Sequence, residues 1–470
     1  MVVARVVTII LATYVCGHWL AGLSVAVLML GWRLLRTPDA PPVLALAFTY
    51  QWIQVTIGIF YTGLTGAHLP ALDRDWETMV LIGLGCVTAL ALGVRLGLDR
   101  AATIWSVPPD APQASGSRRM LLGAYGLALV STGTVQELAW QYPTLTQAIL
   151  ALSFAHLALF FLVVRRFAQP VFEWKWIAGL VGLEVVLGFT GYFAGWREPL
   201  VLAGIATLEV FDTRNARHWA ALSIGGILIV IGSLLWMGIR AQYRQEFQDD
   251  VFASSRSARL ERLQQLSGDW FSQDAGGIGT NMFELIDRLW AIHYPALAVE
   301  RVPNVLPHTE GEILKGAVVH LITPRVLFPD KGELPSDSDM VRKYSGVFVA
   351  GAEENTSIAF GYAAESYVDF GIPLMFVPVF VFGVLMGVAY QWFFTTIRHR
   401  DLALGLVAVM FWLGLYLFER SWVKTLGLNV TMMVYLGGLT FLIDRWLLMR
   451  PAHQLRGDPA DETVYGRAGH

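Results

Sequence analysis

Two prolines enclose an arginine in the segment LITPRVLFPDK, which runs from Leu321 to Lys331. Proline fixes the backbone angle φ and removes an amide donor, so Pro324 and Pro329 restrict the movement of the chain around Arg325. Arginine carries planar, permanently charged donors that match the oxygen atoms of a phosphate group. A stiff turn with such a side chain is suited to binding an oxyanion. The alternative role is that of a loop arginine that binds a helix C-terminus or lipid headgroups.

The segment TSIAFGYAAESYVDFG, residues 356–371, carries a second candidate chemistry. Read as a helix, it places four residues at spacings of four on one small or acidic face: Ser357, Gly361, Glu365 and Asp369. A carboxyl group beside apolar residues can have its pKa raised toward neutrality, so Glu365 is a candidate general base. Alternatively, Glu365 is an acid near a helix start that binds backbone amides or a structural arginine.

Several other ionisable residues admit a functional or a structural role. His293 and His308 are further possible bases, but His293 falls on an apolar stripe, where packing is the expected role. Asp337 and Asp339 form a D-x-D pattern that can hold a divalent metal, yet this spacing often arises by chance in a polar loop, and we predict no metal site. Glu184 lies inside an apolar run, where an ionisable group is either functional or bound to a neighbouring helix.

The composition indicates the environment in which these residues act. Of the 470 residues, 55% are hydrophobic and only 15% are charged, which is typical of a polytopic membrane protein and excludes a soluble domain. The two cysteines, Cys16 and Cys86, lie in apolar runs, so neither a disulfide framework nor a zinc pattern is expected. No feature of the sequence points to a nucleic-acid partner.

Apolar runs predict an all-α bundle of about 11 transmembrane helices, with a range of 10 to 12. The first run, residues 6–32, is expected to be one retained transmembrane helix rather than a cleaved signal peptide. A shorter run, residues 199–211, is included because Arg197 and Glu209 could extend from its ends to the membrane surfaces. The other runs lie at residues 43–63, 79–96, 119–137, 144–164, 175–195, 218–239, 371–396, 402–418 and 428–447.

The distribution of Lys and Arg predicts the orientation. With the N-terminus outside, the inner connections and the C-terminal tail hold 17 of these cations, whereas the short outer segments hold 5. The tail is therefore expected inside and the long connection outside. Four regions follow from this reading: a membrane bundle over 1–239, an outer loop over 240–357, membrane helices over 358–450 and an inner tail over 451–470.

The outer loop is too long to be a simple connector and is expected to carry function. A capping-box pattern at Asn281 and Glu284 predicts one helix start in it, and Thr309 and Glu312 predict another before ILKGAVVHLI. Pro324 should end the second helix. Both helices have an apolar stripe, so we expect them to cover the membrane domain as a lid.

Four motifs in order resemble those of the Wzy-type polymerases of O-antigen and exopolysaccharide repeat units. They are GWREP, ITPRVLFPDK, VRKYSG and TSIAFGYAAESYVDFG, and the resemblance covers roughly residues 195–395. It implies a bundle of the membrane glycosyltransferase C type in the bacterial inner membrane. It also implies that undecaprenyl-pyrophosphate-linked units are polymerised on the periplasmic face, in contact with membrane lipids. A chain-length-regulating co-polymerase and a flippase are further candidate partners.

The resemblance also implies roles for residues. Arg325 would stabilise the pyrophosphate leaving group, and Glu365 would take the proton of the acceptor hydroxyl. No cofactor is expected, and the abundance of arginines in the motifs favours a metal-independent enzyme. The remaining candidates for binding pyrophosphate or sugar are Arg197, Arg240, Lys331, Arg342, Arg288, Tyr344 and Tyr367.

Two other functions stay open. An O-antigen ligase would use the same lipid-linked donor with a different acceptor. A transporter or flippase of lipid-linked sugars would be expected to show repeated halves and charges inside its spans, whereas this chain concentrates its charges in one external loop.

Overall fold

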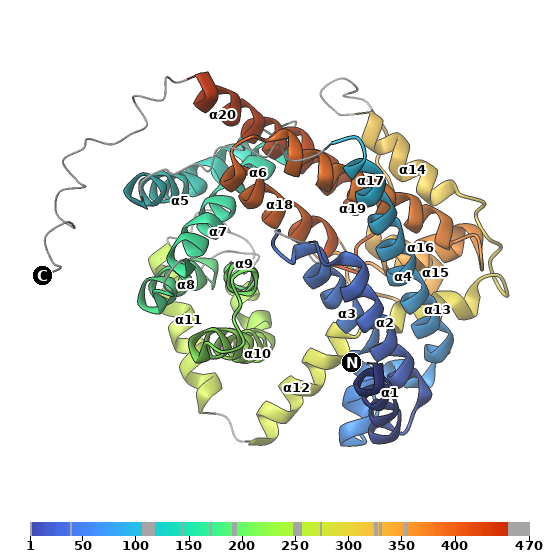
Figure 1. The fold of residues 1–470 in the computed structure, drawn as a ribbon. Coiled ribbons are helices and arrows are strands. Elements are labelled where there is room, and N and C mark those ends of the chain that lie inside the picture. Colours follow the sequence, from blue (N-terminus) through green and yellow to red (C-terminus); the bar gives the residue numbers. More distant parts are fainter. Residues whose placement is uncertain are drawn as a thin grey trace, which may run out of the picture.

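The computed structural model describes residues 2–37, 40–105, 118–142, 145–169, 172–189, 195–247, 256–272, 275–323, 328, 331–351, 353 and 356–449. Within these ranges the regular structure is helical throughout, and no strand occurs (Figure 1). Helix α18 (Arg400–Leu415) is the most enclosed element, because every residue from Ala403 to Leu415 is buried. Figure 1 shows α18 between two groups of helices, α5 to α11 on one side and α2 to α4 with α13 to α17 on the other.

In the part of the chain that the structure describes, six helical segments are long and apolar enough to cross a membrane, so the chain is a helical membrane protein. They are α3 (Val43–Thr65), α4 (Trp76–Ala102), α6 with α7 (Thr146–Ala168), most of α10 (Ala216–Tyr243), α17 (Phe376–Thr396) and α19 with α20 (Trp422–Trp446). The bounds of the helices within these segments are α6 Thr146–Ser153, α7 Ala155–Ala168, α10 Ala216–Phe247, α19 Trp422–Thr431 and α20 Gly437–Met449. A π-helical turn at Met432–Leu436 joins the last two. Helix α5 (Arg118–Gln141) packs against α7.

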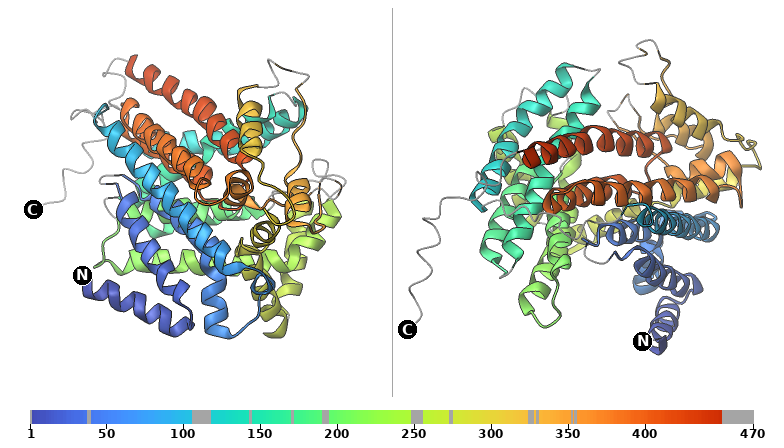
Figure 2. Two further views of the ribbon diagram at one scale, coloured as in Figure 1. Left: turned by 90° about the vertical axis from the view of Figure 1, so that its right-hand side faces the viewer. Right: turned by 45° about the horizontal axis from the view of Figure 1, so that its top comes forward.

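The prediction of one helix over residues 6–32 is wrong. The run forms two helices, α1 (Val2–Cys16) and α2 (Trp19–Leu35), which are separated at Gly17, where φ is +66°. Helix α1 folds back onto α2 at Gly22, where any larger side chain would overlap Thr13. A hydropathy window cannot detect such a break, because both arms are apolar. Figure 2 places α1 at the edge of the molecule.

Three other predicted spans form helices that are shorter than the thickness of a hydrocarbon core. Helix α8 (Trp174–Phe189) has 16 residues, α9 (Arg197–Glu209) has 13 and α18 has 16. At 1.5 Å per residue they extend about 24, 20 and 24 Å, less than the roughly 30 Å of a hydrocarbon core.

An ion-pair network joins one end of α9 to one end of α18. Arg165, in the last turn of α7, lies 2.9 Å from Glu209 and 3.1 Å from Asp401. Glu209 ends α9, and Asp401 lies in the first turn of α18. Since each helix has one end at this common level, its opposite end lies about 20 to 24 Å away, less than the roughly 30 Å of a hydrocarbon core.

Glycines allow α4 and α17 to pack in parallel with almost no side chain between them. Gly93 and Gly97 of α4 face Gly383 and Gly387 of α17, and a Cβ atom at any of these four positions would overlap the backbone of the opposite helix. This is the small-residue spacing that lets helices approach closely in membranes. The pair is a stiff wall of the second group of helices.

The outer loop contains helices, as expected. They are α11 (Arg256–Phe271), α12 (Ala275–Leu289), α13 (His293–Arg301), α14 (Glu312–Ile322) and α15 (Asp337–Ser345), and a short 3-10 helix (Pro70–Asp73) lies in the connection between α3 and α4. The predicted start at Asn281 is wrong, because α12 begins six residues earlier at Ala275. The prediction that Pro324 ends the second helix agrees with the end of α14 at Ile322.

Helix α16 (Gly361–Phe370) is shorter than the helix predicted over residues 356–371. Ser357 precedes α16, so the predicted four-residue face is incomplete. Asp369 has a clear structural partner, because its carboxylate accepts the amides of Ile313 at 3.0 Å and Leu314 at 2.8 Å. A carboxylate at a helix N-terminus accepts hydrogen bonds from the free amide groups and interacts favourably with the positive end of the helix dipole. Asp369 thus fastens α14 to α16.

Candidate functional site

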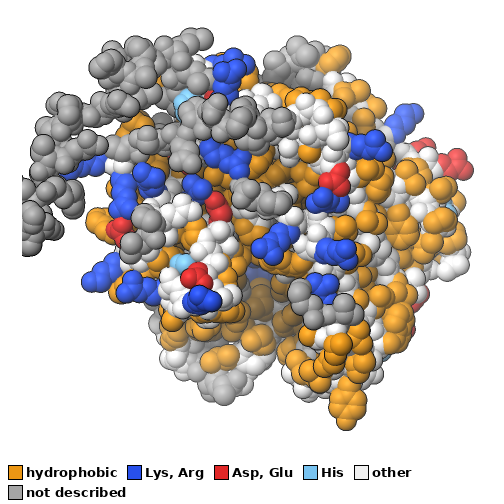
Figure 3. Space-filling model, viewed as in Figure 1, with side chains coloured by type: hydrophobic (Ala, Val, Ile, Leu, Met, Phe, Trp, Pro, Cys, Tyr) orange, Lys and Arg blue, Asp and Glu red, His pale blue; other side chains and the backbone are white. Residues whose placement is uncertain are grey.

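The molecule is hollowed between its two groups of helices. Figure 3 shows this hollow on the face where Lys and Arg side chains gather, and α3, α9, α12 and α18 surround the same place in Figure 1. These four helices carry a group of charged and aromatic side chains that lie far apart in the sequence. We call this group the arginine cluster: Arg197, Arg288, Glu419 and Arg420, with Glu198, Tyr50 and Tyr416 beside them.

Electrostatic interactions place the members of the cluster together. Burial raises the pKa of the Glu419 carboxyl, and the charges of Arg288, Arg197 and Arg420 oppose that rise. Arg197 and Arg288 also act on the hydroxyl of Tyr50. Residues of α9, α12, α3 and the segment after α18 therefore lie within electrostatic range of one another.

Two arginines and one acid of the cluster lack direct partners. Arg197, Arg288 and Glu419 form no hydrogen bond or ion pair with any residue in the described ranges. Both arginines are exposed and Glu419 is half-buried. Their charges therefore act on one another electrostatically, and no direct contact among the described residues neutralises them.

A buried tryptophan sets the position of Arg197. Trp196 is only 1% exposed and stacks on Phe189 with ring centroids 4.9 Å apart. Gly188 and Gly232 leave room for it, since a Cβ atom at either would lie 2.6 or 2.7 Å from Trp196. The tryptophan thus holds the start of α9 against α8 and α10, and Arg197 follows it as the first residue of α9.

A second buried tryptophan sets the position of Arg288. The ring nitrogen of Trp290 donates to the carbonyl of Val55 at 2.9 Å, and its ring fills the space that Gly58 leaves open on α3. The next amide, that of Ala291, donates to the carbonyl of Gln54 at 2.9 Å. The last turn of α12 is therefore docked at the middle of α3.

Two buried glutamines of α3 hold the turn that carries Glu419. Gln54 accepts the amide of Phe418 at 2.8 Å, and Gln51 donates to the carbonyl of Leu415. Backbone groups inside a membrane protein need partners from the protein, because lipid offers none. The glutamines meet that need and fix the turn between α18 and α19.

Arg420 combines a structural role with its position in the cluster. Its guanidinium donates to the Leu413 carbonyl at 2.9 Å, and its carbonyl accepts the amide of Tyr362 at 2.8 Å. Such a donor satisfies the free carbonyls at the C-terminus of α18. It also lies 5.6 Å from the ring of Tyr416.

Aromatic rings form one wall beside the arginines. The ring centroid of Tyr50 lies 5.4 Å from that of Tyr416 and 5.9 Å from that of Trp412. Trp412 stacks on Tyr416 with ring centroids 4.9 Å apart. Trp412 is buried, whereas the two tyrosines are half-buried. The wall therefore presents Tyr50 and Tyr416 at its accessible edge.

The structure brings together only two of the predicted cationic candidates, Arg197 and Arg288. Arg325 lies outside the described residues. Arg240 is half-buried on α10. Lys331 donates to the carbonyl of His320 in the last turn of α14 at 3.0 Å, which is the helix-end role that such cations often take.

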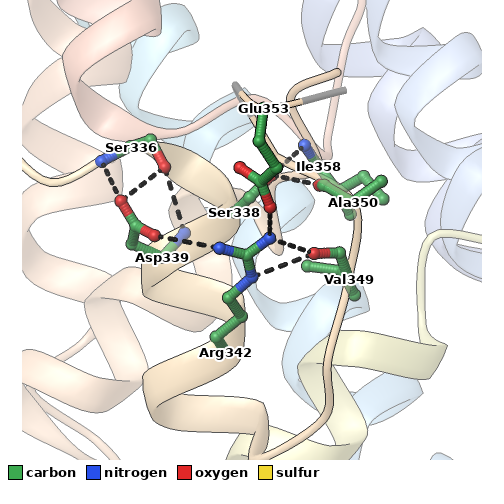
Figure 4. Close-up of polar contacts among 8 residues, drawn as sticks. All are labelled: Ser336, Ser338, Asp339, Arg342, Val349, Ala350, Glu353 and Ile358. Atoms are coloured by element: carbon green, nitrogen blue, oxygen red, sulfur yellow. Dashed lines mark hydrogen bonds and ion pairs between the residues drawn. The ribbon is translucent and has the colours of Figure 1, made fainter. Parts of the chain in front are cut away.

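Arg342 organises its own loop. Figure 4 shows its guanidinium on α15 pointing at the carbonyl of Val349, with Nε at 2.9 Å and Nη2 at 2.6 Å. It also forms ion pairs with Glu353 and Asp339. Ser336 and Asp339 form a capping box at the start of α15, where Asp339 was considered as a metal ligand. The charge of Arg342 is thus compensated locally.

The remaining candidates have packing partners. Tyr344 is buried with its ring centroid 6.2 Å from that of Phe360, and the hydroxyl of Tyr367 donates to the carbonyl of Val302 at 3.0 Å. Glu365 is only 3% exposed, and its Oε2 accepts the amide of Trp422 at 2.7 Å.

Other ionisable residues of the sequence analysis also have structural partners. Asp337 pairs with Lys424 at 2.6 Å. Glu184 accepts the hydroxyl of Tyr125 at 2.7 Å, which is the interhelical hydrogen bond that was one of its two expected roles. No group of three His, Cys, Asp or Glu side chains in the described part of the chain is arranged to hold a metal ion.

Sequence reasoning did not identify Glu419, Arg420, Tyr50 and Tyr416 as site residues. Glu419 and Arg420 follow an apolar run directly; Arg420 was counted only among the cations that predict the orientation, and Glu419 was not considered. The available signal was the pair of glutamines at positions 51 and 54 inside another apolar run, since buried amides in a membrane helix need partners.

Comparison with known proteins gives one match. A family described as a domain of unknown function (DUF8712) matches residues 118–393, more than half of the chain. No curated protein and no solved structure matches.

The environment of Glu365 predicts a pH-dependent stability. Burial raises the pKa of its carboxyl to about 8, from 4.5 in the absence of the fold; the Trp422 amide lowers it, Asp337 and Asp369 raise it, and Lys424 lowers it. Between these pH values the unfolded chain releases a proton that the folded chain keeps, so stability should fall as pH rises.

Thermal unfolding in detergent from pH 5 to 9 measures this effect. Glu365→Gln should flatten the decline, since it keeps an acceptor for the Trp422 amide but cannot ionise. The exposed Glu261→Gln should decline like the wild type. Parallel curves for wild type and Glu365→Gln would show that Glu365 does not ionise in this range.

Proposed function

We propose that this chain, which belongs to the DUF8712 family, polymerises oligosaccharide units carried on undecaprenyl pyrophosphate. The observation that carries the proposal is the pair Arg197 and Arg288, which are exposed and lack partners among the described residues. They lie within electrostatic range of Glu419 and Tyr50 in a helical membrane protein. A ligand for such a place needs a membrane-soluble part and a strongly anionic part, as a polyprenyl pyrophosphate has.

The arginines would act on the leaving group. When the bond between the sugar and the phosphate breaks, negative charge develops on the bridging oxygen. Two permanently charged guanidinium groups can bind that oxygen and its neighbours with paired donors. Arg420 adds positive charge nearby, although its donors are used in part by the end of α18.

In this proposal the chain is a membrane glycosyltransferase of the C type with about 11 membrane-embedded helices, and the six long apolar helices of the described residues support its placement in a membrane. In this proposal α8 and α9 enter from the inner face and return as a pair, because each is shorter than the hydrocarbon core. A pair that enters and returns changes no orientation. The outer loop then stays on the periplasmic side of the bacterial inner membrane, as the cation bias predicts.

Cysteine labelling tests the orientation. A single cysteine at the exposed Val305 should react with an impermeant maleimide in intact spheroplasts, in a background where Cys16 and Cys86 are alanine. The matched cysteine at Arg214, in the connection between α9 and α10, should react only after lysis. The reverse pattern would place the outer loop in the cytoplasm and remove the proposed periplasmic reaction.

Reconstitution with purified lipid-linked repeat units tests the activity itself. We expect the wild type to produce a ladder of lengthening glycans. Arg197→Lys and Arg288→Lys should each slow chain growth by about 100- to 1,000-fold, because lysine keeps the charge but loses the paired donors. The control Arg95→Lys, at an arginine paired with Asp99, should behave like the wild type.

The same assay tests the metal-independent mechanism. Chain growth should continue in EDTA, since the arginines supply the positive charge. Growth that stops in EDTA and returns with magnesium or manganese would contradict this mechanism. A single transfer with no further lengthening would instead favour a ligase, and movement of the donor without any transfer would favour a transporter.

A further inference from the structure

We propose that Glu419 is the catalytic base of this reaction and that Tyr50 and Tyr416 hold the acceptor sugar beside it. The inference rests on the proposed function and replaces Glu365 in the role of the base. It concerns residues that lie outside the motifs of the sequence analysis.

The position of Glu419 is fixed by its backbone. Phe418, the residue before it, donates its amide to Gln54, and Arg420, the residue after it, accepts the amide of Tyr362. Gly361 has φ at +90°, and a Cβ atom there would lie 2.7 Å from the Phe418 carbonyl and 3.1 Å from Cα of Glu419. The start of α16 therefore lies directly against this turn, and the carboxylate extends from a rigid support.

The side chain of Glu419 remains available for a substrate. It has no hydrogen bond or ion pair within the described ranges, and it is half-buried rather than enclosed. The other acids nearby are less accessible. Glu365 is enclosed and bound to the Trp422 amide, and Oε2 of Glu198 is buried without a described partner. Glu419 is thus the carboxylate best placed to reach a group bound in the hollow.

The charges around Glu419 suit the reaction. Arg197 and Arg288 interact with it electrostatically, and no hydrogen bond or ion pair joins them to it in the described ranges. In the proposed complex the donor pyrophosphate lies between the acid and these arginines. Burial raises the pKa of the Glu419 carboxyl, and the charges of Arg288, Arg197 and Arg420 oppose that rise. In the proposed reaction this carboxylate takes the proton of the acceptor hydroxyl.

The step balances as follows. The acceptor hydroxyl oxygen forms a bond to the anomeric carbon of the donor sugar, and its proton passes to the Glu419 carboxylate. The bond between that carbon and the phosphate oxygen breaks, and the electron pair leaves with undecaprenyl pyrophosphate. The additional negative charge faces Arg197 and Arg288, and the proton later passes from Glu419 to water.

The aromatic wall supplies the place for the acceptor. Tyr50 and Tyr416 have ring centroids 5.4 Å apart and lie within electrostatic range of the arginines. Their flat faces can pack against the apolar face of a sugar ring, and their hydroxyl groups can bind its oxygens. An acceptor on this wall would have its hydroxyl between Glu419 and the donor.

Single-turnover chain growth with the reconstituted full chain tests the assignment. Glu419→Gln should slow transfer by about 100-fold or more, as loss of a general base does, while binding of the lipid-linked donor stays at the wild-type level. Glu419→Ala should regain part of its rate when formate is added, because formate can fit the vacated space and accept the proton. The exposed Glu261→Gln serves as the control and should leave both readouts unchanged.

The outcomes separate the two proposals. A ladder of normal rate from Glu419→Gln, or no response of Glu419→Ala to formate, would overturn the role of Glu419 and leave the polymerase proposal standing. Loss of transfer in Glu365→Gln with formate rescue of Glu365→Ala would return the base to Glu365. If the wild type forms no ladder from lipid-linked units, both proposals fail.

Discussion

Interrupted helices inside a membrane protein expose backbone groups that only the protein can satisfy. This constraint governs the centre of the molecule. The turn between α18 and α19 depends on Gln51 and Gln54 of α3 for its partners, and the end of α12 depends on the carbonyls of the same helix. Helix α3 is therefore both a membrane span and the support of two irregular segments. Without the two glutamines, the turn that carries Glu419 would lose partners for its buried polar groups.

Three such interruptions, at the start of α9, at the end of α12 and after α18, position the cationic side chains of the arginine cluster near one another. Arg197 is the first residue of α9 and follows the buried Trp196. Arg288 lies in the last turn of α12, before the buried Trp290, and Arg420 follows α18. In the first two interruptions a tryptophan ring packs against a glycine: Trp196 fills the space beside Gly232, and Trp290 fills the space beside Gly58. The backbone of these interruptions needs buried hydrogen bonds from the protein. The interruptions also leave two arginines, Arg197 and Arg288, without partners among the described residues. That combination indicates a site for an anion with a lipid-soluble part.

The fold class could be predicted from the sequence because hydropathy and helix length are local properties. The break at Gly17 could not, since it depends on how two apolar arms pack against each other. Charge and spacing singled out Arg197 and Arg288 but equally Lys331 and Arg342. The structure separates them, because a carbonyl or a carboxylate from a nearby segment binds the latter two. Glu419 was missed because its position depends on the turn that contains it, which Gln54 holds from 364 positions away in the sequence.

Donor binding tests the central claim most directly. Purified wild-type protein should bind undecaprenyl pyrophosphate in a titration followed by native mass spectrometry, and the double variant Arg197→Ala with Arg288→Ala should lose that binding. The control Arg95→Ala should bind like the wild type, because Arg95 pairs with Asp99 away from the cluster. Undecaprenyl phosphate should bind more weakly than the pyrophosphate, since it offers fewer oxygens to the two arginines. Equal binding of the pyrophosphate by wild type and the double variant would contradict the account.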